Sequence, residues 1–181
     1  MTGLYPHVHG IEGLAHRGWE YKPEVRTLPQ ILKKGKYRSY LIGYQHETSK
    51  IERLGYDECI MPEHKSAPLD EVVPLLKDFF AVHAKDRQAW FISVGCSEVH
   101  SPYDSYVPED ESNIEVPKYI PDCPESRQDL AGFYGAIRHM DKRVGDILDL
   151  LDKNDLSKNT IVIFTTDHGP AWPRAKISNY E

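Results

Sequence analysis

The sequence predicts an α/β fold built on a parallel sheet. Three apolar segments rich in β-branched and aromatic residues are typical of buried strands: KYRSYLIG at 36–43, AWFISVG at 89–95 and NTIVIF at 159–164. Each is preceded by a segment in which apolar residues recur at helical spacing. Helices and strands that alternate in this way form parallel sheets with right-handed crossovers. All three strands should therefore point the same way, with their carboxyl ends at one edge of the sheet.

The first helix is predicted over TLPQILKKG at 27–35. Thr27 and Gln30 give the pattern of a capping box at its start, and Gly35 is a stop signal at its end. The strand KYRSYLIG follows directly and ends at Gly43.

The second helix is predicted between about Leu69 and Ala84, and it leads into the strand AWFISVG. Its apolar residues at helical spacing are Val72, Val73, Leu76, Phe79 and Phe80. Residues 101–126 hold five prolines among acidic residues and serines, which predicts a long irregular loop. Loops of this length often carry function.

The third helix is predicted from about Gln128 to Lys153 and is amphipathic. Its apolar residues are Leu130, Phe133, Tyr134, Ile137, Val144, Ile147, Leu148 and Leu151. The strand NTIVIF follows this helix and runs into TTDHGP, where Gly169 and Pro170 indicate a turn.

Residues that can transfer protons or bind metal follow each predicted strand. His46 comes after the first strand, His100 after the second, and Asp167 with His168 after the third. Ligands of open α/β sheets bind at the carboxyl ends of the strands, so we expect these four side chains to converge there. Such a cluster would suit a metal or an anion. The remaining histidines have no such position and are interpreted as surface or packing residues.

Composition excludes several classes of protein. With 181 residues, 40% of them hydrophobic and 28% charged, the chain has the composition of an ordinary globular domain. A net charge of -6 argues against nucleic acid as a partner, and the basic stretch KKGKYR at 33–38 is explained by the end of the first helix. No stretch approaches the roughly 18 apolar residues of a membrane span. The three cysteines, Cys59, Cys96 and Cys123, show no zinc or C-x-x-C spacing.

Several stretches of the chain, taken together and in their order, resemble the sulfatase family. They are TGLYPHVHGI at 2–11, TLPQILKKGKYRSYLIGYQHE at 27–47, SEVHSPY at 97–103 and GAIRHMDKRVGDILDLLDKNDLSKNTIVIFTTDHGP at 135–170. The ending PRAKISNYE is most similar to the heparan N-sulfatase, or sulfamidase-like, branch. The resemblance implies a parallel-stranded α/β/α sandwich of the alkaline-phosphatase-like fold, incomplete here. It implies a hydrolase of sulfuric esters or sulfamates that acts on a sulfated small molecule or sulfated sugar.

The resemblance also implies a calcium ion, a formylglycine nucleophile made from Cys or Ser, and roles for five residues. His46 matches the histidine that contacts the hydrated formylglycine and takes its proton. His100 matches the histidine that binds sulfate and protonates the leaving group, and Lys176 matches the lysine that clamps the sulfate oxygens. Asp167 matches a calcium ligand, and His168 stands where the family has Asn or His in the metal shell. A carboxylate oxygen suits calcium better than a neutral imidazole does.

One residue inside a matched motif departs from the family. Tyr44 in GYQH stands where the family commonly has a sulfate-contacting lysine, G-K-x-H. Lys176 is then left to carry the positive charge, which puts ordinary sulfate-ester turnover in question. Packing of Tyr44 at the strand end is the alternative to a role at the substrate.

The family's nucleophile motif, C-x-P/A-x-R, is not present among these residues. Cys59 reads CIMPE, Cys96 reads CSEVH and Cys123 reads CPESR. In the family's order, a first strand with two metal-binding aspartates and the nucleophile precedes TGLYPH, and a smaller subdomain follows NYE. We therefore expect residues 1–181 to be part of a catalytic domain that is marginally stable and inactive without the rest of its own chain. A signal peptide would lie upstream, so the compartment stays open.

Two other functions stay open at this point. A non-catalytic remnant could keep a pocket for metal and anion, and phosphodiesterases and phosphonate hydrolases share the fold. The sulfamidase-like ending favours sulfate, whereas the choice between O-sulfate and N-sulfate is open.

Overall fold

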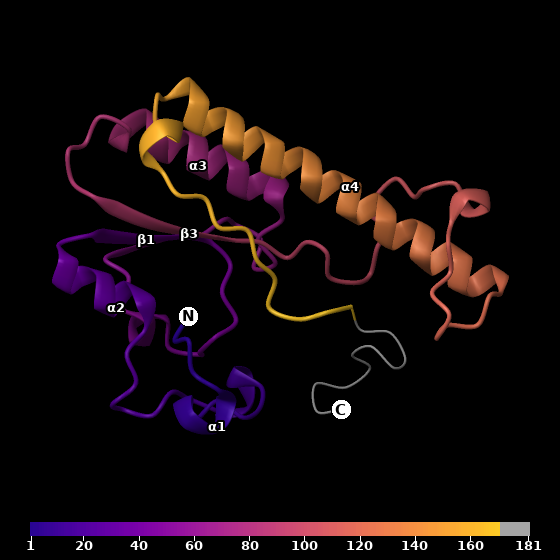
Figure 1. Ribbon diagram of the computed structural model, residues 1–181, viewed down its shortest axis with the longest axis horizontal. Helices are drawn as coiled ribbons and strands as arrows, with labels where there is room; N and C mark the ends of the chain where they lie inside the picture. The colour runs from indigo at the N-terminus through magenta and orange to yellow at the C-terminus, as the bar shows by residue number, and fades with distance from the viewer. Residues whose placement is uncertain (171–181) are drawn as a thin grey trace. The chain divides into compact units, whose positions relative to one another are not determined.

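The computed structural model describes residues 1–170, and the chain divides into two compact units. The first unit, Met1–Ser97, contains a three-stranded sheet with helices. The second unit begins at Glu98 and contains a long loop and one long helix, α4, followed by an extended segment (Figure 1).

The sheet of the first unit is parallel throughout. Its strands are β1 (Arg38–Gly43), β2 (Glu58–Ile60) and β3 (Trp90–Gly95), in the order β2-β1-β3. Both pairings are parallel, which confirms the direction predicted for β1 and β3. Every residue of β1 after its first is buried, as expected for a central strand covered on both faces.

Helices lie on both sides of this sheet. Figure 1 shows α2 (Leu28–Leu32) on one side and α3 (Leu69–His83) on the other, and a short helix α1 (Pro6–His9) precedes them. The capping box predicted at the start of α2 is present. The ring of Tyr40 packs on Phe79 of α3 with 4.6 Å between ring centroids. Helix, sheet and helix therefore form the layers of an α/β/α sandwich.

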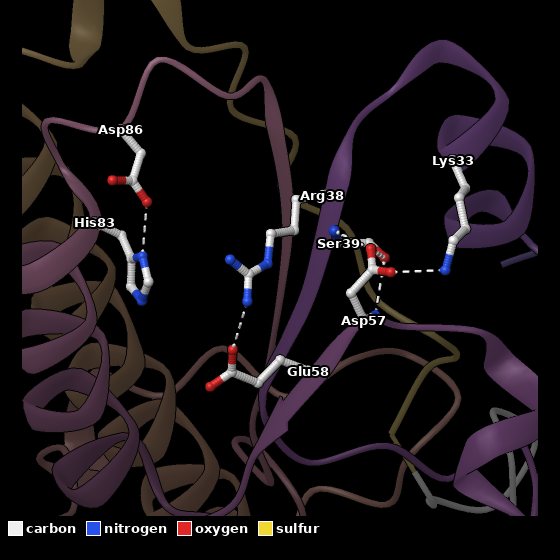
Figure 2. A network of polar contacts seen from close by, with 7 residues as sticks. All are labelled: Lys33, Arg38, Ser39, Asp57, Glu58, His83 and Asp86. Carbon is white, nitrogen blue, oxygen red and sulfur yellow. Dashed lines mark hydrogen bonds and ion pairs between the residues drawn. The ribbon is translucent and has the colours of Figure 1, made fainter.

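A polar network joins the amino end of β1 to the residue before β2 (Figure 2). Lys33 Nζ lies 2.8 Å from Asp57 Oδ1, and Asp57 Oδ2 accepts hydrogen bonds from the backbone N and the Oγ of Ser39 at 2.9 and 3.0 Å. Hydrogen bonds from Lys33 and Ser39 hold the pKa of Asp57 below its usual value. Ser39 is fully buried, so these contacts satisfy polar groups that water does not reach. The same figure shows two flanking pairs, Arg38–Glu58 and His83–Asp86.

The second unit is built on α4 (Pro124–Lys153). The helix begins earlier than the sequence pattern predicted, because Pro124 occupies the first turn, where a missing N–H costs nothing. The irregular loop predicted before it is confirmed, apart from a 3-10 turn at Glu111–Asn113. Within residues 1–170, no helix is both long and apolar enough to cross a membrane.

The loop before α4 is anchored to the helix at several points. Arg127 donates to the carbonyl of Ile114 at 3.1 Å, and Arg138 donates to the carbonyl of Val107 at 2.9 Å. Gly135 lets the loop approach the helix closely, since a Cβ atom at this position would lie 2.2 Å from the Val107 oxygen. The loop that begins near His100 is therefore fixed to α4.

The prediction of a third strand at NTIVIF, residues 159–164, is wrong: the structure forms no strand there. Within the described residues, 160–166 pair with no strand. The side chains Ile161, Val162, Ile163 and Phe164 are 90%, 54%, 80% and 67% exposed. The pattern fits a buried strand, but a strand also needs a neighbour to pair its backbone groups, and the described residues supply none.

Candidate functional site

The ends of β1 and β3 lie against each other at the carboxyl edge of the sheet. Gly43 and Gly95 are partners in register, and the backbone N of Tyr44 donates to the Gly95 oxygen at 2.9 Å. A Cβ atom at Gly95 would lie 1.8 Å from the Tyr44 oxygen, and one at Gly43 would lie 2.1 Å from the Gly95 oxygen. Only glycine fits such an approach. Both strands therefore end together, which fixes where the segment with His46 leaves the sheet.

His46 lies on the turn that follows β1, and its side chain is exposed. The ring of Tyr44 lies beside it, with 5.8 Å between the ring centroids. Tyr44 itself is half-buried at the strand end. The contact between the rings of Tyr44 and His46 agrees with packing of Tyr44 at the strand end. A contact between Tyr44 and the substrate stays a prediction.

The side chain of Gln45 closes the turn around His46. Gln45 Oε1 accepts hydrogen bonds from the backbone N of Glu47 at 2.8 Å and of Thr48 at 3.2 Å. Gln45 Nε2 donates to the Thr48 oxygen at 2.9 Å. A side chain that bonds neighbouring backbone groups in this way takes the place of the regular pairing of a strand or helix.

Glu47 joins the turn to a distant segment. Its Oε2 accepts a hydrogen bond from the hydroxyl of Tyr21 at 2.8 Å. Tyr21 is buried in a cluster with Val25 and Leu54. Burial, together with the charge of Glu47, raises the pKa of Tyr21 well above its ordinary value, so its hydroxyl stays a donor. Sequence reasoning missed this contact, which joins residues 26 positions apart.

His9 packs next to this pair. Its ring meets that of Tyr21 edge-on, at 5.3 Å between centroids. The backbone N of Ile11 donates to His9 Nδ1 at 3.1 Å, so this nitrogen carries a lone pair. Burial lowers the pKa of His9, which favours the neutral ring. The ring of His9 therefore packs against Tyr21.

In the second unit, His100 is exposed and hydrogen-bonded to the backbone. Its Nδ1 donates to the carbonyl oxygen of Ser101. A carbonyl oxygen can only accept, so the proton of the neutral ring resides on Nδ1. Nε2 is then the atom of His100 that can gain or give a proton.

Asp167 and His168 form an exposed pair within the second unit. The backbone N of His168 donates to Asp167 Oδ1 at 2.8 Å, and His168 Nδ1 donates to the Gly169 oxygen at 2.8 Å. Asp167 Oδ2 lies 3.3 Å from His168 Nε2. The backbone N–H of His168 therefore fixes the carboxylate of Asp167, and Nε2 of His168 lies beside that carboxylate.

The donor set available for calcium is partial. Among residues 1–170, no three His, Cys, Asp or Glu side chains lie together as a metal site. Calcium takes about six to eight oxygen ligands. Asp167 has the right chemistry for one of them.

The predicted site residues are thus placed in separate parts of the molecule. His46 belongs to the first unit, whereas His100, Asp167 and His168 belong to the second. Their convergence stays a prediction. Lys176 lies outside the described residues.

Comparison with known proteins gives one consistent family. The family model described as Sulfatase matches residues 1–179. Human N-sulphoglucosamine sulphohydrolase is 24% identical over 99% of this chain, and an ulvan-active sulfatase of Formosa agariphila is 34% identical over 93% of it. Human N-acetylgalactosamine-6-sulfatase is 27% identical over 94%.

Solved structures of other proteins have a similar fold. A structure from Bacteroides thetaiotaomicron, described with that organism's metabolism of multiple glycosaminoglycans, matches 94% of this chain at a TM-score of 0.71 and 17% identity. This chain covers 48% of that structure, and 42%, 39% and 40% of the three relatives named above. The chain therefore spans less than half the length of the proteins that it matches here.

Proposed function

The chain belongs to the sulfatase family, and we propose that the complete protein hydrolyses sulfuric esters or sulfamates. Its fold is the alkaline-phosphatase-like fold of the sulfatases. The observation that carries the proposal is the family match over residues 1–179, which includes His46 on its fixed turn at the carboxyl edge of the sheet. Ligands of parallel α/β sheets bind at that edge.

We propose a sulfated sugar as the substrate. The relatives are named as a sulphohydrolase of N-sulphoglucosamine, a sulfatase of N-acetylgalactosamine 6-sulfate and a sulfatase active on ulvan. These names share a sulfated sugar or polysaccharide, and they differ in whether an O-linked or N-linked sulfate is removed. The proposal therefore covers both linkages.

His46 is proposed as the base of the reaction. An exposed imidazole on a turn with a fixed backbone can be held within hydrogen-bond reach of the group whose proton it takes. Tyr44 beside it limits the directions in which the ring can turn. A histidine suits this role because its ordinary pKa lies near neutral pH.

His100 is proposed as the acid that protonates the leaving oxygen or nitrogen. Because Nδ1 already donates to the Ser101 oxygen, the proton transferred is the one on Nε2 of the imidazolium. Lys176 is proposed to contact sulfate oxygens, where a positive charge stabilises the charge that develops.

We also propose a calcium ion that has Asp167 and His168 among its neighbours and a formylglycine in a part of the protein outside residues 1–181. When present, they supply positive charge and a nucleophile, respectively. Asp167 would contribute a carboxylate oxygen to the ion, and His168 would be oriented by the hydrogen bond from its Nδ1 to the Gly169 oxygen.

An assay of the full-length protein with three model substrates tests this function. Aryl sulfate, aryl sulfamate and aryl phosphodiester are compared under one set of conditions, with calcium added. We expect turnover of the sulfate or the sulfamate to exceed that of the phosphodiester. Turnover of the phosphodiester alone would contradict the proposal, and no turnover of any substrate or of sulfated sugars would favour a non-catalytic binding protein.

A further inference from the structure

We propose that Tyr21, Gln45 and Glu47 are positioning residues that hold His46 in place for proton transfer. The inference rests on the proposed function, since it assumes that His46 acts on the substrate. It goes further by assigning a task to three residues that do not themselves contact the reacting atoms.

The first support is the way in which the backbone of the turn is held on both sides of His46. Gln45 precedes it and bonds the backbone of Glu47 and Thr48 through both atoms of its amide. Thr48 is itself buried, with 4% of its surface exposed. An exposed histidine between such neighbours has little freedom left in its backbone, and its reach is set by its side-chain rotamer alone.

The second support is an anchor that connects the turn to the core. Tyr21 is 8% exposed and packs with Val25 and Leu54, so its hydroxyl has a fixed position. This hydroxyl donates to Glu47 Oε2 over 2.8 Å, and the acceptor is charged. Hydrogen bonds with an ionised partner are about twice as strong as neutral ones. Glu47 is thus fixed by its side chain and by its backbone N–H, one residue after His46.

A second contact between the same two segments supplies a matched control. Lys50 Nζ lies 2.9 Å from a carboxylate oxygen of Glu20, one residue before Tyr21. Its side chain is 61% exposed, and exposed pairs of this kind contribute little. If any contact between the two segments were sufficient to position His46, loss of the Lys50 side chain would lower the activity as much as loss of the Glu47 side chain. If the part-buried hydrogen bond between Tyr21 and Glu47 positions His46, only the loss of Glu47 lowers the activity.

The test uses four variants of the full-length protein: Tyr21→Phe, Glu47→Ala, Glu47→Gln and Lys50→Ala. Steady-state kinetics on a sulfate ester give kcat and KM separately, and hydrogen exchange is followed in the peptide that covers residues 44–50. We expect Tyr21→Phe and Glu47→Ala to lower kcat about 10- to 100-fold with KM nearly unchanged, since small displacements of a catalytic group cost that much. Glu47→Gln keeps an oxygen that can accept from Tyr21, so it should retain most of the activity, as should Lys50→Ala.

The outcomes separate this inference from the proposed function. Unchanged kcat in folded Tyr21→Phe and Glu47→Ala would overturn the positioning role, as would an equal loss in Lys50→Ala. If the unmodified protein turns over no sulfate, the proposed function fails and hydrogen exchange decides about the turn. Faster exchange at 44–50 in Tyr21→Phe and Glu47→Ala, but not in Lys50→Ala, would support the anchor, and equal exchange in all variants would overturn it.

Discussion

Replacing His100 by alanine is expected to lower kcat/KM for a sulfated sugar by about 100- to 10,000-fold, and for 4-nitrophenyl sulfate far less. A sugar alkoxide is a poor leaving group and needs a proton as it departs, whereas nitrophenolate leaves readily without one. The Nδ1 of His100 is bonded to the Ser101 oxygen, so Nε2 is the only source of that proton on this side chain. Steady-state kinetics of the full-length protein on both substrates measure the difference.

His64→Ala is the matched control for this substitution. His64 is also an exposed histidine, with 72% of its side chain accessible, and it pairs with Glu71. The His64→Ala variant should keep the kcat/KM of the unmodified protein for both substrates. A loss in His100→Ala that is equal for the sugar and the nitrophenyl substrate would show that His100 does not act as the acid.

Replacing Gly95 by alanine is expected to destabilise the first unit by about 3 kcal/mol, near the upper end for overpacking. The added Cβ atom would meet the Tyr44 oxygen at 1.8 Å. Because this obstacle is backbone, a change of rotamer cannot relieve it, and β1 and β3 must separate where they leave the sheet. Urea unfolding of the full-length protein, followed by the fluorescence of Trp90 and the other tryptophans, gives the change in free energy.

Gly35→Ala provides the comparison within the same unit. A Cβ atom there would have Tyr37 as its nearest neighbour at 3.5 Å, which is ordinary van der Waals contact. The effect should stay within about 0.5 kcal/mol, as for most surface changes. Similar effects at Gly95 and Gly35 would mean that the strands yield easily at their ends.

Local signals in the sequence predicted local structure well. The capping box of Thr27 and Gln30 joins residues only three positions apart, so its pattern can be recognised in the sequence. The strands β1 and β3 carry continuous apolar runs that suit a sheet covered by helices, and both form where predicted. The helix α4 has enough turns for its apolar face to be read from the sequence alone.

The sequence was a poorer guide where a strand forms only if a neighbouring strand pairs with it. The strand β2 spans only Glu58–Ile60, too short for an alternating pattern to stand out, and it exists because β1 pairs with it. The segment NTIVIF shows the reverse case, since its pattern is strong but the described residues give it no neighbour. Composition indicates what a segment can bury, whereas pairing decides whether a strand forms.

The same division applies to the site. The positions of His46 and His100 after β1 and β3 followed from the order of the strands. The bond from Tyr21 to Glu47 did not, because it joins a core tyrosine to a turn far along the chain. Long-range contacts of this kind depend on the packed structure. They leave no periodic signal in the sequence.

The most direct test of the proposed function is the release of inorganic sulfate from a sulfated glucosamine by the full-length protein and its His46→Ala variant. We predict sulfate release by the unmodified protein and a rate about 100- to 10,000-fold lower in the variant, the range for loss of a proton-transfer residue. Equal rates in the two proteins would contradict the catalytic role of His46.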